Sequence, residues 1–271
     1  MSLVDQQNAI GVFDSGVGGI STLRTLTRML PHEDFIFYGD SANAPYGEKS
    51  ASRVYDLTRA AVDHLREHHV KAVVIACNTA TSAAKPELMK LYTDLPFLGI
   101  EPATKQAVDS GKKNILVMAT PLTLSLDKFH QQEERFGSSA NIYPLPCPRL
   151  AELIEKGPAG LPEIRSYLKG LLSSARKSWK QPLDAAVLGC THYPFISDII
   201  AEQLGSSVEL FTGYEGLGRN LKRQLANHGL LRAAGSSHGA SHTQSVEFMS
   251  SKNTADELAL YRRLFEYGFS D

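Results

Sequence analysis

The chain has 271 residues, of which 42% are hydrophobic and 21% are charged, and its formal net charge is −1. This composition is ordinary for a soluble globular protein of one or two domains with a sizeable buried core. The near-neutral balance argues against nucleic acid or an anionic membrane as the primary partner. The N-terminal residues lack the pattern of a signal peptide, and no apolar run approaches the ~20 residues of a membrane span, so we expect a cytoplasmic protein.

The first predicted strand, residues 9–13, leads into a glycine-rich turn, DSGVGG at residues 14–19, and then into an amphipathic helix. Glycines allow a ligand to approach the backbone, and the helix start offers free N–H groups, so we expect a small carboxylate at this turn. A dinucleotide site is the alternative, with Asp40 on the ribose. It fails because the GxGxxG pattern from Gly16 requires glycine where Ser21 stands.

A second strand at residues 35–38 enters a turn-rich loop at 39–47, which is a candidate binding loop. Ser50 caps the next predicted helix. The third strand, residues 72–76, ends at Cys77 in the stretch VIACNTAT (74–81), before a helix at 81–91 and a strand at 97–100.

The pattern restarts after residue 101, with predicted strands at 114–119, 141–145, 185–188 and 208–211. Helices are expected at 124–136, at 150–157, after Pro162, and from 196 to 204. The strand at 185–188 delivers Cys190 in the stretch VLGCTHYP (187–194), which parallels the context of Cys77. Cys147, between two prolines, is interpreted as a small buried hydrophobe.

The last part predicts a helix at 217–231, a strand at 245–249 and a helix at 257–267. Residues 233–242 are small and polar, which is typical of a surface loop. His238 and His242 in this loop have no carboxylate or thiol beside them, and no CxxC spacing occurs in the chain, so we expect no metal.

These elements predict an α/β fold of two similar lobes, each with a mostly parallel sheet flanked by helices. The chain crosses near residue 101 and returns near residue 213. We therefore expect a discontinuous first lobe (1–101 and 213–271) and a second lobe at 102–212. Because ligands bind at the carboxyl ends of parallel strands, Cys77 and Cys190 should face each other across a cleft between the lobes.

Two thiols on opposite sides of one substrate suit stereoinversion at an acidic carbon. One thiolate takes the Cα proton while the opposite thiol donates a proton to the other face. A pyridoxal phosphate enzyme would need a Schiff-base lysine, and no lysine stands beside either cysteine, so a cofactor-free reaction is favoured.

Four motifs carry a family resemblance: FDSGVGG (13–19), PYGEKS (45–50), ACNTA (76–80) and GCTHYP (189–194). Their order and spacing resemble the glutamate racemase family over residues 9–213. Related aspartate racemases usually have Glu after the second Cys-Thr pair; His192 stands there in this chain, which favours glutamate.

The resemblance implies that Cys77 acts on D-glutamate and Cys190 on L-glutamate, with Asp14 and His192 as auxiliary groups. A helix cap for Asp14 and a loop hydrogen bond for His192 remain open. A third auxiliary carboxylate is expected at Glu155, with Glu152 as the alternative and a surface role still possible. The implied substrate contacts are Asp14, Ser15, Pro45, Tyr46, Gly47, Cys77, Asn78, Thr79, Thr120, Cys190, Thr191 and His192.

By this resemblance we expect a homodimeric, cofactor-independent racemase that supplies D-glutamate for bacterial peptidoglycan. Racemisation of aspartate or another amino acid on the same fold is the second hypothesis. A non-catalytic two-lobed amino-acid binding protein is the third, and a protein whose main task is an interaction is the fourth. The tail after Ala233 matches no motif.

Overall fold

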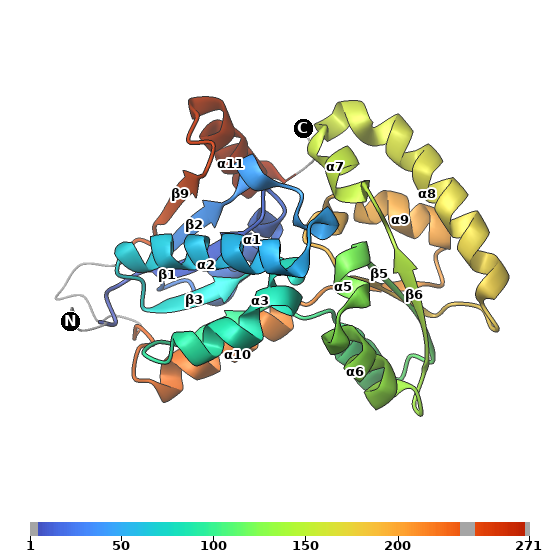
Figure 1. Cartoon of the computed structure of the whole chain (residues 1–271), viewed down its shortest axis with the longest axis horizontal. Coiled ribbons are helices and arrows are strands. Elements are labelled where there is room, and N and C mark those ends of the chain that lie inside the picture. Colours follow the sequence, from blue (N-terminus) through green and yellow to red (C-terminus); the bar gives the residue numbers. More distant parts are fainter. Residues whose placement is uncertain (1–4, 234–241, 269–271) are drawn as a thin grey trace.

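Two parallel β-sheets, each covered by helices on both faces, form two lobes joined side by side (Figure 1). The computed structural model describes residues 5–233 and 242–268. The first sheet has the order β4-β3-β1-β2-β9 and the second the order β6-β5-β7-β8. Every pairing in both sheets is parallel. The predicted fold class is confirmed.

The strands of the first sheet are β1 (Ile10–Asp14), β2 (Phe35–Gly39), β3 (Ala72–Ile75), β4 (Phe97–Gly99) and β9 (Val246–Ser250). Those of the second are β5 (Asn114–Ala119), β6 (Asn141–Pro146), β7 (Ala185–Leu188) and β8 (Glu209–Phe211). The central strands β1, β3 and β7 are buried along their whole length, as expected for strands covered on both faces.

The helices are α1 (Gly19–Met29), α2 (Ala51–Glu67), α3 (Asn78–Leu91), α4 (Thr104–Asp109), α5 (Pro121–Ser125), α6 (Asp127–Phe136), α7 (Leu150–Glu155), α8 (Leu161–Ala175), α9 (Ser197–Leu204), α10 (Tyr214–Asn227) and α11 (Ala255–Tyr267). Helices α1, α10 and α11 pack on one face of the first sheet, and α2 and α3 on the other. In the second lobe α7, α8 and α9 oppose α4, α5 and α6 across the sheet. None of the helices in the described ranges is long and apolar enough to span a membrane.

Helix starts differ most from the sequence prediction. Helix α3 begins at Asn78 rather than at 81, because the Cys77 thiol caps it by accepting a hydrogen bond from the Ala80 N–H. The predicted helix at 124–136 is two helices, because Thr120 caps a short first one and extended backbone at Leu126 ends it. Helix α4 was not predicted, and α10 begins at Tyr214 rather than at 217.

The two lobe connections lie against each other. A Cβ atom added at Gly213 would clash with the Glu101 carbonyl oxygen, so glycine allows the returning chain to pass close to the outgoing one. After this return, α10, β9 and α11 lie with the first lobe, and in Figure 1 their orange and red ribbons run along its lower and upper edges. The lobe boundaries near 101 and 213 stay a prediction.

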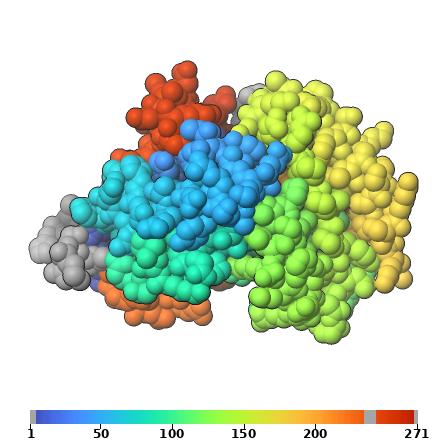
Figure 2. Space-filling model, in the orientation of Figure 1, coloured from blue at the N-terminus to red at the C-terminus, as the bar shows by residue number. Residues whose placement is uncertain are grey.

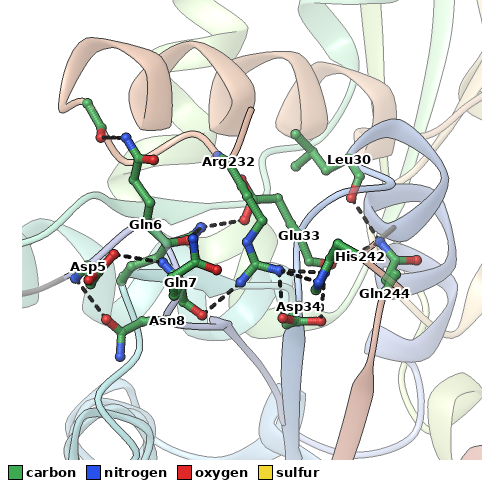
Figure 3. A network of polar contacts seen from close by, with 12 residues as sticks. Asp5, Gln6, Gln7, Asn8, Leu30, Glu33, Asp34, Arg232, His242 and Gln244 are labelled. Carbon is green, nitrogen blue, oxygen red and sulfur yellow. Dashed lines mark hydrogen bonds and ion pairs between the residues drawn. The ribbon is translucent and has the colours of Figure 1, made fainter. Parts of the chain in front are cut away.

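A buried polar network at the amino end of the first sheet holds β9 beside β2 (Figure 3). The backbone N–H of Arg232 donates to Glu33 Oε1 at 2.8 Å, and its guanidinium donates to Asp34 Oδ2 at 2.7 Å. Glu33 also pairs with Lys71, and both side chains are almost fully buried. Removing one partner of such a pair typically costs ~3–5 kcal/mol.

His242 takes part in this network as a partner of Asp34. His238 lies outside the described residues. Within the described ranges, no group of three or more His, Cys, Asp or Glu side chains could hold a metal ion.

Candidate active site

The carboxyl ends of strands from both sheets meet at one cavity between the lobes. Cys77 follows β3, Thr120 follows β5 and Cys190 follows β7. The predicted residues that line the cavity are Ser15, Pro45, Tyr46, Gly47, Cys77, Asn78, Thr79, Thr120, Cys190, Thr191, His192 and Glu155. The structure thus brings together side chains that are up to 177 positions apart in the chain, including both strand-end thiols.

Asp14 is the one predicted contact residue that does not line the cavity. It is fully buried at the end of β1, where it accepts hydrogen bonds from the Gly16 N–H at 3.1 Å and the Thr191 hydroxyl at 3.2 Å. Burial raises the pKa of Asp14 to about 6, although His192 and these donors oppose the shift. Asp14 can therefore exchange a proton near neutral pH.

Cys77 is a buried thiol at the N-terminus of α3, 3.4 Å from the Ala80 N–H that it caps. Burial and, second, the nearby charge of Asp14 raise the pKa of Cys77 to about 12. The resting form on this side of the cavity is therefore the protonated thiol, which can donate a proton.

Cys190 belongs to a different kind of cluster. Its Sγ lies 3.8 Å from His192 Nδ1, and His192 Nε2 lies 2.9 Å from Glu155 Oε1. Burial disfavours the imidazolium, but hydrogen bonds to Cys190 and Glu155 hold the pKa of His192 well above its usual value. Burial also acts to raise the pKa of Glu155, yet the hydrogen bond from His192 keeps it below its usual range. These three side chains, the Cys190 relay, form a thiol–imidazole–carboxylate chain.

Of the two candidate carboxylates, Glu155 is the one that reaches His192. Glu152 also lines the cavity, but its carboxylate pairs with Arg149, 3.7 Å away, and both side chains are about half exposed.

Hydroxyl groups and a helix start cover the wall between the thiols. Thr120 Oγ1 lies 3.0 Å from Thr79 Oγ1 and 2.8 Å from Thr123 Oγ1. Asn78 Oδ1 is buried without a hydrogen-bond partner among the described residues. The first turn of α3 adds backbone N–H groups at its positive dipole end, a common arrangement for anion binding.

Some cavity residues escaped the sequence analysis. Cys147 lines the cavity, although its burial, its raised pKa and its 3.3 Å hydrogen bond to the Leu145 carbonyl fit the predicted small buried side chain. At the mouth, Glu48 Oε1 of the first lobe accepts a hydrogen bond from the Arg149 N–H of the second at 3.1 Å. Arg149 has a left-handed backbone, φ 61°, which no sequence signal indicated.

The fold and the cavity define a class: two-lobed α/β proteins with a cavity between the lobes, at the carboxyl ends of the strands. Known proteins agree with this assignment. The sequence model of the Asp/Glu/Hydantoin racemase family matches residues 10–215. Glutamate racemase of Clostridium novyi (strain NT) is 49% identical over 217 residues, which cover 80% of this chain and 83% of that protein.

Solved structures give the same result. A glutamate racemase isoform from Bacillus anthracis has a TM-score of 0.84 at 27% identity, covering 97% of this chain and 95% of that one. Glutamate racemase from Francisella tularensis, in complex with D-glutamate, has a TM-score of 0.80 at 27% identity, covering 96% and 94%. The chain therefore belongs to the Asp/Glu/Hydantoin racemase family, and it is an isomerase.

Proposed function

We propose that this protein interconverts L- and D-glutamate without a cofactor, by proton transfer between Cα and two thiols. The observation that carries the proposal is the pair of strand-end thiols, Cys77 and Cys190, which line one buried cavity from opposite lobes. The names of the similar proteins support glutamate as the substrate.

The two sides of the cavity suggest which group takes a proton and which group donates one in each turnover. Starting from L-glutamate, the Cys190 thiolate, paired with imidazolium, takes the Cα proton. The Cys77 thiol then donates its proton to the opposite face, which leaves D-glutamate, a Cys77 thiolate and a protonated Cys190. The reverse reaction starts from that second form. Asp14, with its pKa of about 6, assists on the Cys77 side, and His192 with Glu155 assists on the Cys190 side.

Substrate carboxylates would be held by neutral donors. The Thr79, Thr120 and Thr191 hydroxyls and the start of α3 supply hydrogen bonds, while the unpartnered Asn78 Oδ1 suits the ammonium group. Ser15, Pro45, Tyr46 and Gly47 close the first-lobe side. Water exclusion strengthens these interactions as negative charge develops at Cα.

The wider role follows from the family resemblance. We propose that the D-glutamate serves bacterial peptidoglycan synthesis, and that the protein works in the cytoplasm as a homodimer. Light scattering coupled to size exclusion tests the dimer. Rescue of a bacterium that requires added D-glutamate tests the supply of this amino acid.

The direct test is to incubate the purified chain with L-glutamate and no added cofactor, and to follow the enantiomers by chiral chromatography. We expect D-glutamate to rise to an equal share, with aspartate converted far more slowly. Faster turnover of aspartate, or dependence on added pyridoxal phosphate, would contradict the proposal.

A further inference from the structure

The glycines of the turn between β1 and α1 face protein atoms of the other lobe. A Cβ atom added at Gly18 would lie 2.5 Å from Thr191 Oγ1 and 2.6 Å from His192 Nδ1. One added at Gly16 would lie 2.8 Å from Glu155 Oε1. These separations are shorter than side-chain Cβ atoms tolerate, so the missing side chains make room for the second lobe.

Backbone conformation does not explain either glycine. Neither has a left-handed φ, and Gly18 is helical, with φ −58° and ψ −37°. Alanine adopts this conformation readily and favours a helix more than glycine does. What excludes a larger residue at these positions is therefore the contact across the lobes.

The atoms that a side chain would displace are already held in place. The His192 ring is fixed between Cys190 Sγ and Glu155 Oε1, and the Thr191 hydroxyl donates to Asp14 Oδ2. Behind them, Ser21 Oγ lies 3.0 Å from the Thr191 carbonyl oxygen. A shift of the His192 ring therefore lengthens its hydrogen bond to Cys190 Sγ or to Glu155 Oε1.

The contact lies along the interlobe seam. In Figure 2 the blue atoms of the first lobe lie directly against the yellow-green atoms of the second. Tyr214, where the chain has just returned to the first lobe, adds a hydroxyl 2.6 Å from Ser21 Oγ. The segment from Cys190 to His192 is thus supported by first-lobe residues although it follows β7 of the second-lobe sheet.

We infer that Gly16 and Gly18 are positioning residues for the Cys190 relay, because their bare backbone is the surface on which His192 and Glu155 rest. The inference rests on the proposed function and deepens it. The turn has a second task beyond closing the substrate site: it makes one proton-transfer unit depend on the correct docking of both lobes.

The test compares Gly18→Ala and Gly16→Ala with a matched control, Gly216→Ala. Gly216 lies in α10, and a Cβ atom there meets nothing within 4 Å. In the full-length protein, alkylation of Cys190 and Cys77 by iodoacetamide is measured by peptide mass spectrometry between about pH 6 and pH 9. Kinetic constants for both enantiomers are measured alongside.

In Gly18→Ala we expect the ratio of Cys190 to Cys77 alkylation near neutral pH to fall about tenfold, because the displaced His192 ring loses its contact with Cys190 Sγ while the surroundings of Cys77 stay unchanged. Turnover should fall about 10- to 100-fold, since displacements near 1 Å have such effects, while KM changes less. Gly16→Ala should act in the same direction but more weakly, because the Glu155 carboxylate is the end of a flexible chain. Gly216→Ala should match the wild type.

An unchanged alkylation ratio in Gly18→Ala, or an equal fall for both thiols, would overturn the inference. If circular dichroism shows that Gly18→Ala does not fold, the ratio in Gly16→Ala decides alone. Alkylation needs no turnover. If the wild-type protein does not racemise glutamate, the proposed function is rejected. The positioning role is retained in that case if Gly18→Ala still changes the ratio of Cys190 to Cys77 alkylation.

Discussion

The two ends of the first sheet both bury polar groups, but they use them differently. At the amino end, opposite charges are paired: Lys71 with Glu33, and Arg232 with Asp34. At the carboxyl end, burial raises the pKa values of Asp14 and Cys77, and Asn78 Oδ1 has no partner among the described residues. The two ends differ in access, because Cys77 and Asn78 line the cavity and can meet a substrate, whereas the amino-end ion pairs do not line it.

The largest effect on activity should come from the carboxyl end. Cys77→Ala and Cys190→Ala should each reduce racemisation by about 10²- to 10⁴-fold, because the remaining thiol reaches one face of Cα. Stability should change by only about 1 kcal/mol. Coupled measurements of turnover and urea unfolding check this prediction.

Cys147→Ala is the matched control for these two variants, since it removes a third buried thiol from the same cavity. Its activity should stay within about tenfold of the wild type, as a thiol outside the proton-transfer path contributes no acid–base term. A loss as large as that of Cys77→Ala would contradict the assignment of roles.

The amino end should show the opposite pattern. Lys71→Met leaves Glu33 buried without its cation and should cost ~3–5 kcal/mol of unfolding free energy, with turnover below the melting transition within about twofold. Adding Glu33→Gln, which keeps an acceptor for the Arg232 N–H, should recover part of the loss. A Lys71→Met variant that loses little unfolding free energy but has impaired turnover would contradict the assignment of stability to the amino end and of chemistry to the carboxyl end.

Asp14→Asn sharpens the comparison through pH. Because burial raises the pKa of Asp14 from its ordinary value of 3.8 to about 6, its stabilising contribution is complete below pH 3.8 and is lost as pH rises through 6. The variant should therefore gain stability over the wild type by about 2 kcal/mol more at pH 7.5 than at pH 4.5, while losing activity. Thermal melts at both pH values measure the gain, and a pH-independent difference would show that Asp14 ionises normally.

Glu155→Gln should have the smallest effect, a fall in turnover of about tenfold. The loss of the carboxylate charge removes one of the groups that raise the pKa of His192. The imidazolium should then lose its proton at lower pH, so the alkaline limb of the pH–activity profile shifts to lower pH. Glu152→Gln is the control because Glu152 pairs with Arg149 instead. A shift of the alkaline limb in Glu152→Gln, but not in Glu155→Gln, would show that Glu152 is the carboxylate that acts on His192.

The sequence predicted the features that depend on residues close together in the chain, such as buried strands and the residues that follow them. The apolar runs before Cys77 and Cys190 indicated buried strands, so the thiols were expected at strand ends, and the structure places both at one cavity. It could not predict contacts set by lobe docking. Gly18 packs against His192, and the Arg149 N–H donates a hydrogen bond to Glu48. Each contact joins residues more than 100 positions apart, and no local sequence pattern predicts it. The family resemblance favoured Glu155 over Glu152, but the contact between Glu155 and His192 depends on which face of α7 meets that side chain.

The central claim, two thiols acting on opposite faces of one carbon, is tested most directly by racemising L-glutamate in D2O and analysing both pools early in the reaction. Thiol protons exchange with solvent, so the thiol that donates is already deuterated. We predict deuterium at Cα of the D-glutamate product and retained protium in the unreacted L-glutamate. Early deuterium in both pools, or a product that keeps the abstracted proton, would show that one base serves both faces and would contradict the account.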